Sequence, residues 1–423
     1  MLQVGFIRDH KEEVISRLSK RIDDPEKIVN DILSLDISRR DTQTQFDKIS
    51  SELNIISKEI GTLFKSGQSK KATFLKQKTQ VLKEQKSVLT ELLNNTTTNL
   101  NNLLYQTPNL PHSLVPEGNS DKDNEEVFRS GETPDLNDDA LPHWELAKKF
   151  DIIDFELGNK ITGAGFPVYK GKGARLQRAL INYFLDKNTN AGYDEVQVPH
   201  LVNEASGLGT GQLPDKEGQM YYVQADDLYL IPTGEVPATN IFRDVIFKSS
   251  DLPKKLTTYT PCFRREAGSY GAHVRGLNRL HQFDKVEILR VEHPSKSYEA
   301  LDSMVNHVKE ILNELKLPYR ILRLCSGDLG FTSALTYDFE VYSAAQKRWL
   351  EVSSVSNFET FQSNRLKLRF KNSDGKSQLA HTLNGSALAL PRILAGILEN
   401  YQTNSGIEIP EVLIPYTGFE SIN

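Results

Sequence analysis

Cysteine is scarce in this sequence of 423 residues, which contains only Cys262 and Cys325. The two form no CxxC pair, so the sequence offers neither a disulfide framework nor a thiolate zinc site, and we expect no zinc. Apolar runs are also short, and none reaches the roughly 18 residues that a membrane-spanning helix needs. Charged residues enter the N-terminal segment too early for a signal peptide. We therefore expect a cytoplasmic protein that does not span a membrane.

A large excess of charge of one sign is missing as well, because 51 Lys and Arg residues oppose 56 Asp and Glu residues. The charges are nevertheless unevenly distributed. Residues 39–86 contain eleven basic and five acidic side chains, whereas residues 112–144 contain nine acidic and two basic ones. A basic segment within an acidic protein indicates a localised contact with a polyanion.

The basic segment has the pattern of a helical hairpin. From Ile28 to Leu63, one set of positions alternates spacings of four and three, with polar interruptions only at Arg39 and Thr42. Two helices of about 35 and 30 residues, joined by a short turn, predict an antiparallel coiled-coil arm over about residues 27–98, roughly 45–50 Å long. A dimerising coiled coil with solvated lysines is the alternative. The apolar stripe of the second helix contains Phe74/Leu75, Val81/Leu82, Val88/Leu89 and Leu92/Leu93.

Beyond the arm, the pattern changes to mixed helix and strand. Residues 106–143, rich in Pro, Asn and acidic side chains, are predicted to connect an N-terminal domain (1–105) to a C-terminal domain (144–423). Short β-rich runs with few helices between them predict an α+β domain with an antiparallel sheet. The predicted helices are Gly173–Asn190 and Ser297–Leu315, and the predicted strands are Tyr193–Val198, Leu228–Ile231, Leu256–Cys262, Lys285–Val291, Tyr337–Val341 and Trp349–Val355.

Charged side chains gather on a long predicted hairpin, formed by residues 260–268 and 279–287 around a loop of about a dozen residues. Strand alternation places Arg264 and Glu266 on one face and Arg265 on the other. A guanidinium and a carboxylate on one face suit a ligand that has both a phosphate and hydrogen-bond donors. A cross-strand salt bridge is the alternative for this pair taken alone.

Three further segments carry polar groups that could bind a ligand. Glu351, followed by two serines, offers the oxygen ligands that Mg²⁺ prefers. Arg392 lies opposite the apolar face of a predicted helix, beside small residues that leave room for a flat or anionic ligand, although a surface arginine is the alternative. Gly207–Pro214 is glycine-rich but lacks the strand and helix context of a P-loop, so we predict a mobile binding loop.

Several segments together resemble the seryl-tRNA synthetase family. FRREAG and RGLNRLHQFDKVE are similar to motif 2 of class II aminoacyl-tRNA synthetases, and NGSALALPRILAGILEN is similar to motif 3. PTGEVP, GLGTGQLP, LEVSSVSN and the ending IPEVLIPYTG resemble the seryl enzymes specifically. The likeness covers essentially the whole chain. It implies an antiparallel-sheet class II catalytic domain, preceded by a helical arm that binds tRNA.

The resemblance implies residues that bind ATP and Mg²⁺. Arg264 matches the motif 2 arginine that holds the α-phosphate, and Glu266 matches the carboxylate on the adenine side. Arg392 matches the motif 3 arginine, which lies over the nucleotide and reaches its γ-phosphate. Glu351 and Ser354 match the pair that binds Mg²⁺. Other residues implied at the nucleotide are Arg265, Leu280, Phe283, which matches the aromatic ring stacked on adenine, Val352 and Ser353.

The resemblance also implies a pocket for L-serine. Its matching residues are Thr233, Gly234, Glu235, Glu287 and Ser386. Glu235 and Glu287 are the candidates for binding the hydroxyl and the ammonium group, and the sequence does not apportion them. Pro199 matches motif 1, which implies a homodimer.

The implied activity is that of a ligase that activates L-serine with ATP and transfers it to the 3′ end of tRNA(Ser), with tRNA(Sec) as a further candidate substrate. One alternative is a paralogue that activates an amino acid and loads a carrier protein, which would be expected to lack the arm. The other is a catalytically inactive regulatory protein, against which Arg264, Glu351 and Arg392 argue.

Overall fold

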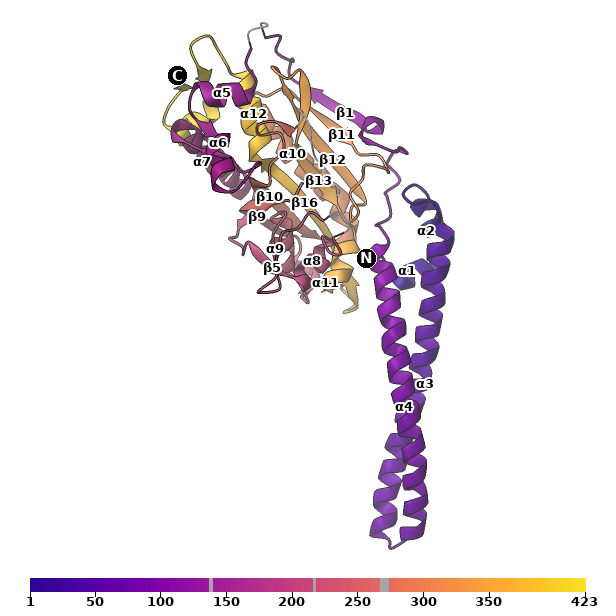
Figure 1. The fold of residues 1–423 in the computed structure, drawn as a ribbon. Coiled ribbons are helices and arrows are strands. Elements are labelled where there is room, and N and C mark those ends of the chain that lie inside the picture. Colours follow the sequence, from indigo (N-terminus) through magenta and orange to yellow (C-terminus); the bar gives the residue numbers. More distant parts are fainter. Residues whose placement is uncertain (137–139, 216–217, 267–273) are drawn as a thin grey trace. The chain divides into compact units, whose positions relative to one another are not determined.

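Two compact units make up the chain in the computed structural model, Leu2–Pro108 and Asn109–Asn423 with Met1 (Figure 1). Among the described residues, no helix combines the length and the apolar character that crossing a membrane requires. The described residues are 1–136, 140–215, 218–266 and 274–423.

The N-terminal unit is helical and contains the predicted arm. Asp24 caps the first long helix by accepting a hydrogen bond from the Lys27 backbone N–H, and Pro25 occupies the first helical position. The two long helices have 41 and 38 residues, so both exceed the predicted lengths, and the first is about 60 Å long at 1.5 Å per residue. The helices of this unit are α1 (Val4–Asp9), α2 (Lys11–Leu18), α3 (Pro25–Lys65) and α4 (Ser69–Gln106).

The predicted seam packs between α3 and α4. All of its positions on α3 are buried or half-buried. On α4, Leu82 is 7% exposed, whereas its neighbour Val81 is 53% exposed. Each helix covers only one face of the other. One residue of each predicted apolar pair on α4 therefore packs against α3, and the other remains at the surface. The antiparallel coiled-coil arm is confirmed.

One polar interruption of the seam belongs to a charge cluster. The buried Asp36 carboxylate accepts hydrogen bonds from Arg39 at 2.9 Å, from Arg40 at 3.0 Å and from Arg8 of α1 at 3.0 Å. Burial acts to raise the pKa of Asp36, but the three guanidinium groups hold it below its ordinary value. The bond from Arg8 therefore fixes α1 against α3, and Arg39 and Arg40 help to keep Asp36 ionised.

An eight-stranded sheet forms the centre of the second unit within its described residues, and only the pair β4–β9 is parallel. This sheet, with helices packed against it, confirms the predicted α+β class. In spatial order its strands are β1 (Glu125–Ser130), β11 (Tyr319–Arg323), β12 (Leu335–Ser343), β13 (Arg348–Asn357), β16 (His381–Ala389), β10 (Gln282–Glu292), β9 (Lys254–Phe263) and β4 (Asp194–Glu195).

The three longest helices described in this unit pack into the main hydrophobic core with this sheet: α7 (Gly171–Asn190), α10 (Ser297–Glu314) and α12 (Leu390–Asn400). In α12, every residue from Leu390 to Glu399 is buried except Arg392, so the helix presents one charged group from an otherwise apolar surface. The shorter helices are α5 (His143–Lys149), α6 (Phe155–Ile161), α8 (Glu204–Thr210), α9 (Glu235–Asn240), α11 (Phe361–Leu366) and α13 (Ile414–Thr417).

Small sheets complete the unit. Their strands are β2 (Ile153–Asp154) with β3 (Val168–Tyr169), β5 (Leu201–Asn203) with β7 (Leu228–Leu230) and β6 (Tyr222–Val223), β8 (Ile246–Lys248) with β14 (Arg369–Lys371) and β15 (Ser377–Leu379), and β17 (Ile407–Glu408) with β18 (Ser421–Ile422).

The structure differs from the sequence-based expectation at several strands. The predicted strand Tyr193–Val198 is shorter, because only Asp194–Glu195 pairs with β9. Strand β16 was not predicted, because its Asn, Gly and Ser residues are typical of a turn. The predicted connector contains β1, which pairs with β11 at the edge of the sheet. Most residues of β1 are exposed, so the strand lacks the apolar alternation by which strands are detected.

Candidate active site

A cavity of about 590 Å³ lies over the central strands of the large sheet. Three predicted residues do not line the cavity. Gly234 and Glu287 contact residues that do, whereas Arg265 lies against Tyr221. Segments far apart in the sequence therefore converge on one site. The predicted residues that line it are Thr233, Glu235, Arg264, Glu266, Leu280, Phe283, Glu351, Val352, Ser353, Ser354, Ser386 and Arg392.

Arg264 follows directly after β9 and is fixed at three points. Its backbone N–H donates to the His281 carbonyl at 2.9 Å, and its Nε donates to the Pro232 carbonyl at 3.2 Å. Its guanidinium carbon lies 5.3 Å from the centre of the Phe283 ring. A cation over an aromatic face is attracted to it, so the ring helps to orient the positive charge in the cavity.

Glu266 also lines the cavity, but strand alternation is not the reason. Strand β9 ends at Phe263, and Glu266 has a left-handed φ of 48°. The Glu266 carboxylate pairs with Arg279, whereas the Arg265 guanidinium lies 6.0 Å from the Tyr221 ring centre. Arg264 and Arg265 thus point to different surroundings, as predicted, although the chain has already left strand β9 at Phe263. Residues 267–273 of the predicted hairpin loop lie outside the described residues.

Arg392 and Glu351 lie side by side in the wall of the cavity. Arg392 Nη1 donates to the Glu351 carbonyl at 2.8 Å and lies 3.5 Å from the Glu351 carboxylate, while Arg392 Nε donates to the Asn278 carbonyl at 3.0 Å. These bonds fix the plane of the guanidinium group. About half of the Glu351 side chain is exposed, so its carboxylate remains open to a ligand.

Beside Glu351 the cavity wall has a buried carboxyl group, Asp338, that the sequence did not indicate. Asp338 pairs in register with Ser354, and its Oδ1 has no hydrogen-bond partner among the described residues. Burial and the nearby Glu351 charge raise the pKa of Asp338 well above its ordinary range. A buried, unpartnered carboxyl oxygen near a second carboxylate and a hydroxyl forms a set of hard oxygen donors that fits Mg²⁺.

A second group of polar side chains lies at one end of the cavity, around Glu287. Thr233 Oγ1 lies within 2.9 Å of both Glu287 carboxylate oxygens, and the Glu235 backbone N–H donates to Glu287 at 3.0 Å. Gly234 approaches so closely that a Cβ would lie 2.8 Å from a Glu287 oxygen. Ser386 pairs in register with Glu287 and lines the same end. The five residues predicted for serine therefore lie together.

Glu235 is the second carboxylate of this group, and its surroundings alter its protonation. Burial, followed by the charge of Glu287, raises the pKa of Glu235 to about 7. Its carboxylate accepts a hydrogen bond from Gln362. Two buried carboxylates against one buried cation, Lys285, leave an excess of negative charge that favours a ligand with a cation beside them.

Two residues of this group, Lys285 and Gln362, were not predicted from the sequence. Lys285 Nζ is buried, 2.9 Å from Thr233 Oγ1 and 3.0 Å from Glu287. A signal for Lys285 was available, because alternation along the predicted strand places it on the same face as Glu287. Gln362 comes from α11, and nothing in its local sequence indicates a site.

Half of the glycine-rich segment is helical, so the prediction of a loop is wrong for residues 207–210. Residues up to Thr210 belong to α8, and the helix ends at Gly211, which has a φ of 90°. A Cβ at Gly207 would lie 2.8 Å from Leu213, and one at Gly209 would lie 2.6 Å from Leu366. These glycines allow close packing of the helix. Only Gln212, beyond the helix, lines the cavity from this segment.

The large sheet and the cavity over it belong to a known class, the class II aminoacyl-tRNA synthetases. The family model described as "tRNA synthetase class II core domain (G, H, P, S and T)" matches residues 221–401. The model described as "Seryl-tRNA synthetase N-terminal domain" matches residues 1–111.

Known proteins resemble this chain over its full length. The serine–tRNA ligases of Salinibacter ruber and Thermotoga maritima are each 49% identical to it, covering all of this chain and 99% and 100% of their own. The crystal structure of seryl-tRNA synthetase from Pyrococcus horikoshii complexed with ATP superposes with a TM-score of 0.91 at 32% identity, covering 100% of this chain and 99% of that one. The chain belongs to the seryl-tRNA synthetase family.

Proposed function

We propose that this protein is a serine–tRNA ligase that uses ATP to convert L-serine to seryl-adenylate and then transfers serine to tRNA(Ser). The observation that supports it most is the set of charges around the cavity. Arg264 and Arg392 line it and suit phosphates, while the buried Glu235 and Glu287 suit an ammonium group. One cavity can thus hold a nucleotide and an amino acid together.

The proposed chemistry needs charge stabilisation and no side-chain nucleophile. The serine carboxylate attacks the α-phosphorus of ATP, and diphosphate leaves with the electron pair of the broken P–O bond. Arg264 holds the α-phosphate and Arg392 the γ-phosphate, and their positions are already fixed by the hydrogen bonds to Pro232, Asn278 and Glu351. Preorganised charges of this kind lower the barrier without reorganisation during the reaction. Phe283, Leu280 and Glu266 would contact the adenine base of ATP.

Glu351 and Ser354 would hold Mg²⁺ together with the nucleotide, and the unpartnered oxygen of Asp338 makes that residue a third candidate. The ion supplies positive charge that offsets the phosphate charges. The described residues contain no cluster of three or more His, Cys, Asp or Glu side chains that could hold a metal by themselves. We therefore propose that ATP contributes to the site.

Selection of serine would depend on its hydroxyl and ammonium groups. A pocket built to bond a hydroxyl rejects the analogue that lacks it, because its own polar groups then stay unpaired in a buried site. Glu235, Glu287 and Thr233 provide such buried groups beside the cavity.

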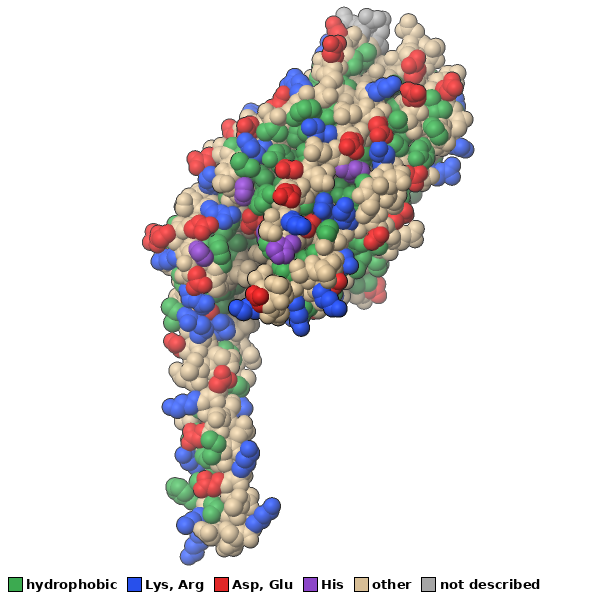
Figure 2. Space-filling view, turned by 180° about the vertical axis from the view of Figure 1, so that it is seen from behind, with side chains coloured by type: hydrophobic (Ala, Val, Ile, Leu, Met, Phe, Trp, Pro, Cys, Tyr) green, Lys and Arg blue, Asp and Glu red, His purple; other side chains and the backbone are tan. Residues whose placement is uncertain are grey.

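We propose that the coiled-coil arm binds tRNA, so that residues 1–105 act as the tRNA-binding domain. Figure 2 shows basic side chains spread along the visible face of the arm. Duplex RNA hides its base edges in a deep, narrow groove, so the contact would be mainly with the RNA backbone and shape. The same contact would admit tRNA(Sec), if that RNA has the same shape. The arm counts against loading of a carrier protein.

We further propose a cytoplasmic homodimer formed through the motif 1 region around Pro199. Strand β4 lies at an open edge of the sheet, next to a hollow of about 480 Å³ lined by α7 and β4. An unpaired edge of this kind can be covered by a partner. Sedimentation of the purified protein at micromolar concentration should give twice the chain mass of 47.8 kDa, and a monomer would contradict the proposal.

ATP–diphosphate exchange with each of the twenty amino acids tests the proposed activity. We expect exchange with serine well above that with alanine, threonine or cysteine. Subsequent charging of total tRNA should yield seryl-tRNA. Exchange that is best with another amino acid, or absent with all twenty, would overturn the assignment.

A further inference from the structure

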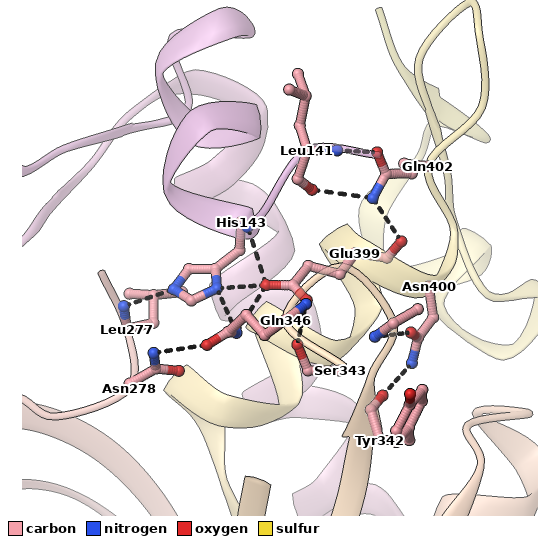
Figure 3. A network of polar contacts seen from close by, with 11 residues as sticks. Leu141, His143, Leu277, Asn278, Tyr342, Ser343, Gln346, Glu399, Asn400 and Gln402 are labelled. Carbon is pink, nitrogen blue, oxygen red and sulfur yellow. Dashed lines mark hydrogen bonds and ion pairs between the residues drawn. The ribbon is translucent and has the colours of Figure 1, made fainter. Parts of the chain in front are cut away.

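A buried polar network is centred on Glu399 of α12 (Figure 3). The Glu399 carboxylate is inaccessible to solvent, yet it accepts hydrogen bonds from the His143 backbone N–H at 3.0 Å and from Gln346 Nε2 at 2.9 Å. It also pairs with His143 Nδ1 at 2.7 Å and with the Ser343 hydroxyl. Burial acts to raise the pKa of Glu399, but the bonds from His143 and Ser343 lower it below its ordinary value. The group therefore carries a buried negative charge.

His143 links this charge to the second part of motif 2, which begins at Arg275. The Leu277 backbone N–H donates to His143 Nε2 at 2.8 Å. Because that nitrogen accepts a hydrogen bond, it carries no proton, and the proton of the neutral ring is on Nδ1, where it is donated to Glu399. Gly276 makes this close approach possible, since a Cβ there would lie 2.3 Å from His143 Nε2.

Gln346 makes a second link to the same segment. Its Oε1 accepts a hydrogen bond from Asn278 Nδ2 at 2.9 Å, while its Nε2 is bound to Glu399. The carbonyl oxygen of Asn278 in turn accepts the hydrogen bond from Arg392 Nε. A continuous chain of bonds therefore runs from Glu399 through Gln346 and Asn278 to a charged group in the cavity.

We propose that His143, Gln346 and Glu399 are positioning residues that set the orientation of Arg392 through the backbone of Leu277 and Asn278. The inference rests on the proposed function, in which Arg392 binds the γ-phosphate of ATP. The network bonds to Leu277 and Asn278, and Asn278 bonds to Arg392. All three of these residues line the cavity. An apolar cluster would fill the same space, often without loss of stability, but it would not fix the direction of a carbonyl group.

The proposal predicts which ligand is affected. Arg392 is assigned to the γ-phosphate, so a misdirected guanidinium should weaken binding of ATP and not of AMP. A role in stability alone would lower the melting temperature without changing the ratio of the two affinities. The ATP-to-AMP affinity ratio therefore separates positioning from general stabilisation.

Isothermal titration of the full-length Gln346→Met and Glu399→Met variants with ATP and with AMP tests the proposal. We expect ATP affinity to fall about three- to tenfold, the range of one or two lost hydrogen bonds, with AMP affinity changed less than about twofold. Glu399→Gln keeps the acceptor oxygen and should retain ATP affinity within about twofold. Ser297→Ala removes a buried hydroxyl that bonds to His381 and Asn357, away from the cavity lining, and should leave both affinities unchanged.

A double-mutant cycle completes the test. In an Arg392→Ala background, Gln346→Met should weaken ATP no further, because the group that it positions is gone. Equal losses with and without Arg392, or unchanged ATP affinity in a folded Gln346→Met protein, would overturn the inference. If Glu399→Met fails to fold, Gln346→Met decides the question alone. Absence of serine-dependent exchange in the unmodified protein would instead overturn the proposed function.

Discussion

The arm and the catalytic cavity are built in opposite ways. The arm is made from two continuous stretches of sequence, and its packing repeats along one seam of α3 and α4. The cavity takes its side chains from strands, a helix end and loops that lie more than a hundred residues apart. The arm therefore tolerates change at most positions between its seam residues, whereas the cavity depends on a few groups held at fixed places.

The largest effect of a single substitution should come from the buried polar group around Glu287. Glu287→Ala removes the carboxylate to which Thr233, Lys285 and the Glu235 N–H are bonded, and leaves the buried Lys285 ammonium without its counter-charge. We expect serine-dependent exchange to fall by about 10³–10⁴-fold, with ATP affinity changed less than about threefold. Exchange kinetics and nucleotide titration measure the two effects. Unchanged exchange would remove Glu287 from the site.

Arg264→Ala should have the next largest effect. It removes a fixed positive charge assigned to the α-phosphate, and the loss of one such group costs about 10²–10³-fold in rate. Arg369→Ala, which removes an exposed arginine of β14 outside the cavity lining, is the matched control and should change exchange less than about twofold. A rate for Arg264→Ala within threefold of the unmodified protein would contradict its assignment.

In the arm, the position of a residue relative to the seam should decide the effect. Leu82→Ala removes a buried seam residue and should destabilise the arm locally by about 2 kcal/mol, whereas Val81→Ala at the exposed neighbouring position should cost less than about 0.5 kcal/mol. Hydrogen exchange of arm amides measures both changes. Serine-dependent exchange should be the same in the two variants. Equal destabilisation would contradict the described packing of α4.

The smallest predicted effect is a dependence on pH. Because the pKa of Glu235 is raised to about 7 in the ligand-free protein, the group binds a proton as the pH falls below 7 and loses its attraction for an ammonium group. The value of kcat/KM for serine should then fall about tenfold per pH unit below 7. The same raised pKa lowers folding stability as the pH rises from about 4.5 to 7, since the folded state binds the additional proton. Glu235→Gln should remove both dependences, and an unaltered profile in that variant would exclude Glu235 as their source.

The same contrast explains how much the sequence could predict. The seam of the arm follows from heptad spacing, because each of its contacts repeats a local pattern. The motif residues of the cavity were identified by resemblance, and the structure brings them together. Asp338, Lys285 and Gln362 were missed, since their role depends on strand pairing and on packing between distant segments. Residues 207–210 of α8 were predicted as part of a loop. Their glycines allow close packing, and no local pattern distinguishes a glycine with this role from a glycine in a flexible loop.

We expect the cavity to activate serine without the arm, and the arm to be needed only for tRNA. Lys86 Nζ lies 4.9 Å from the centre of the Phe46 ring, so a short Gly/Ser linker can replace residues 47–85 at a level where the two helices are in contact. This change keeps the Asp36 cluster and removes eight of the eleven basic residues counted above.

Serine-dependent ATP–diphosphate exchange and tRNA charging should be measured side by side on this variant. Our account predicts exchange within about threefold of the unmodified protein and charging reduced by at least about 10²-fold, because most of the backbone contacts to the RNA are lost. Loss of exchange in a folded variant, or charging at the unmodified rate, would contradict the separation of the two functions.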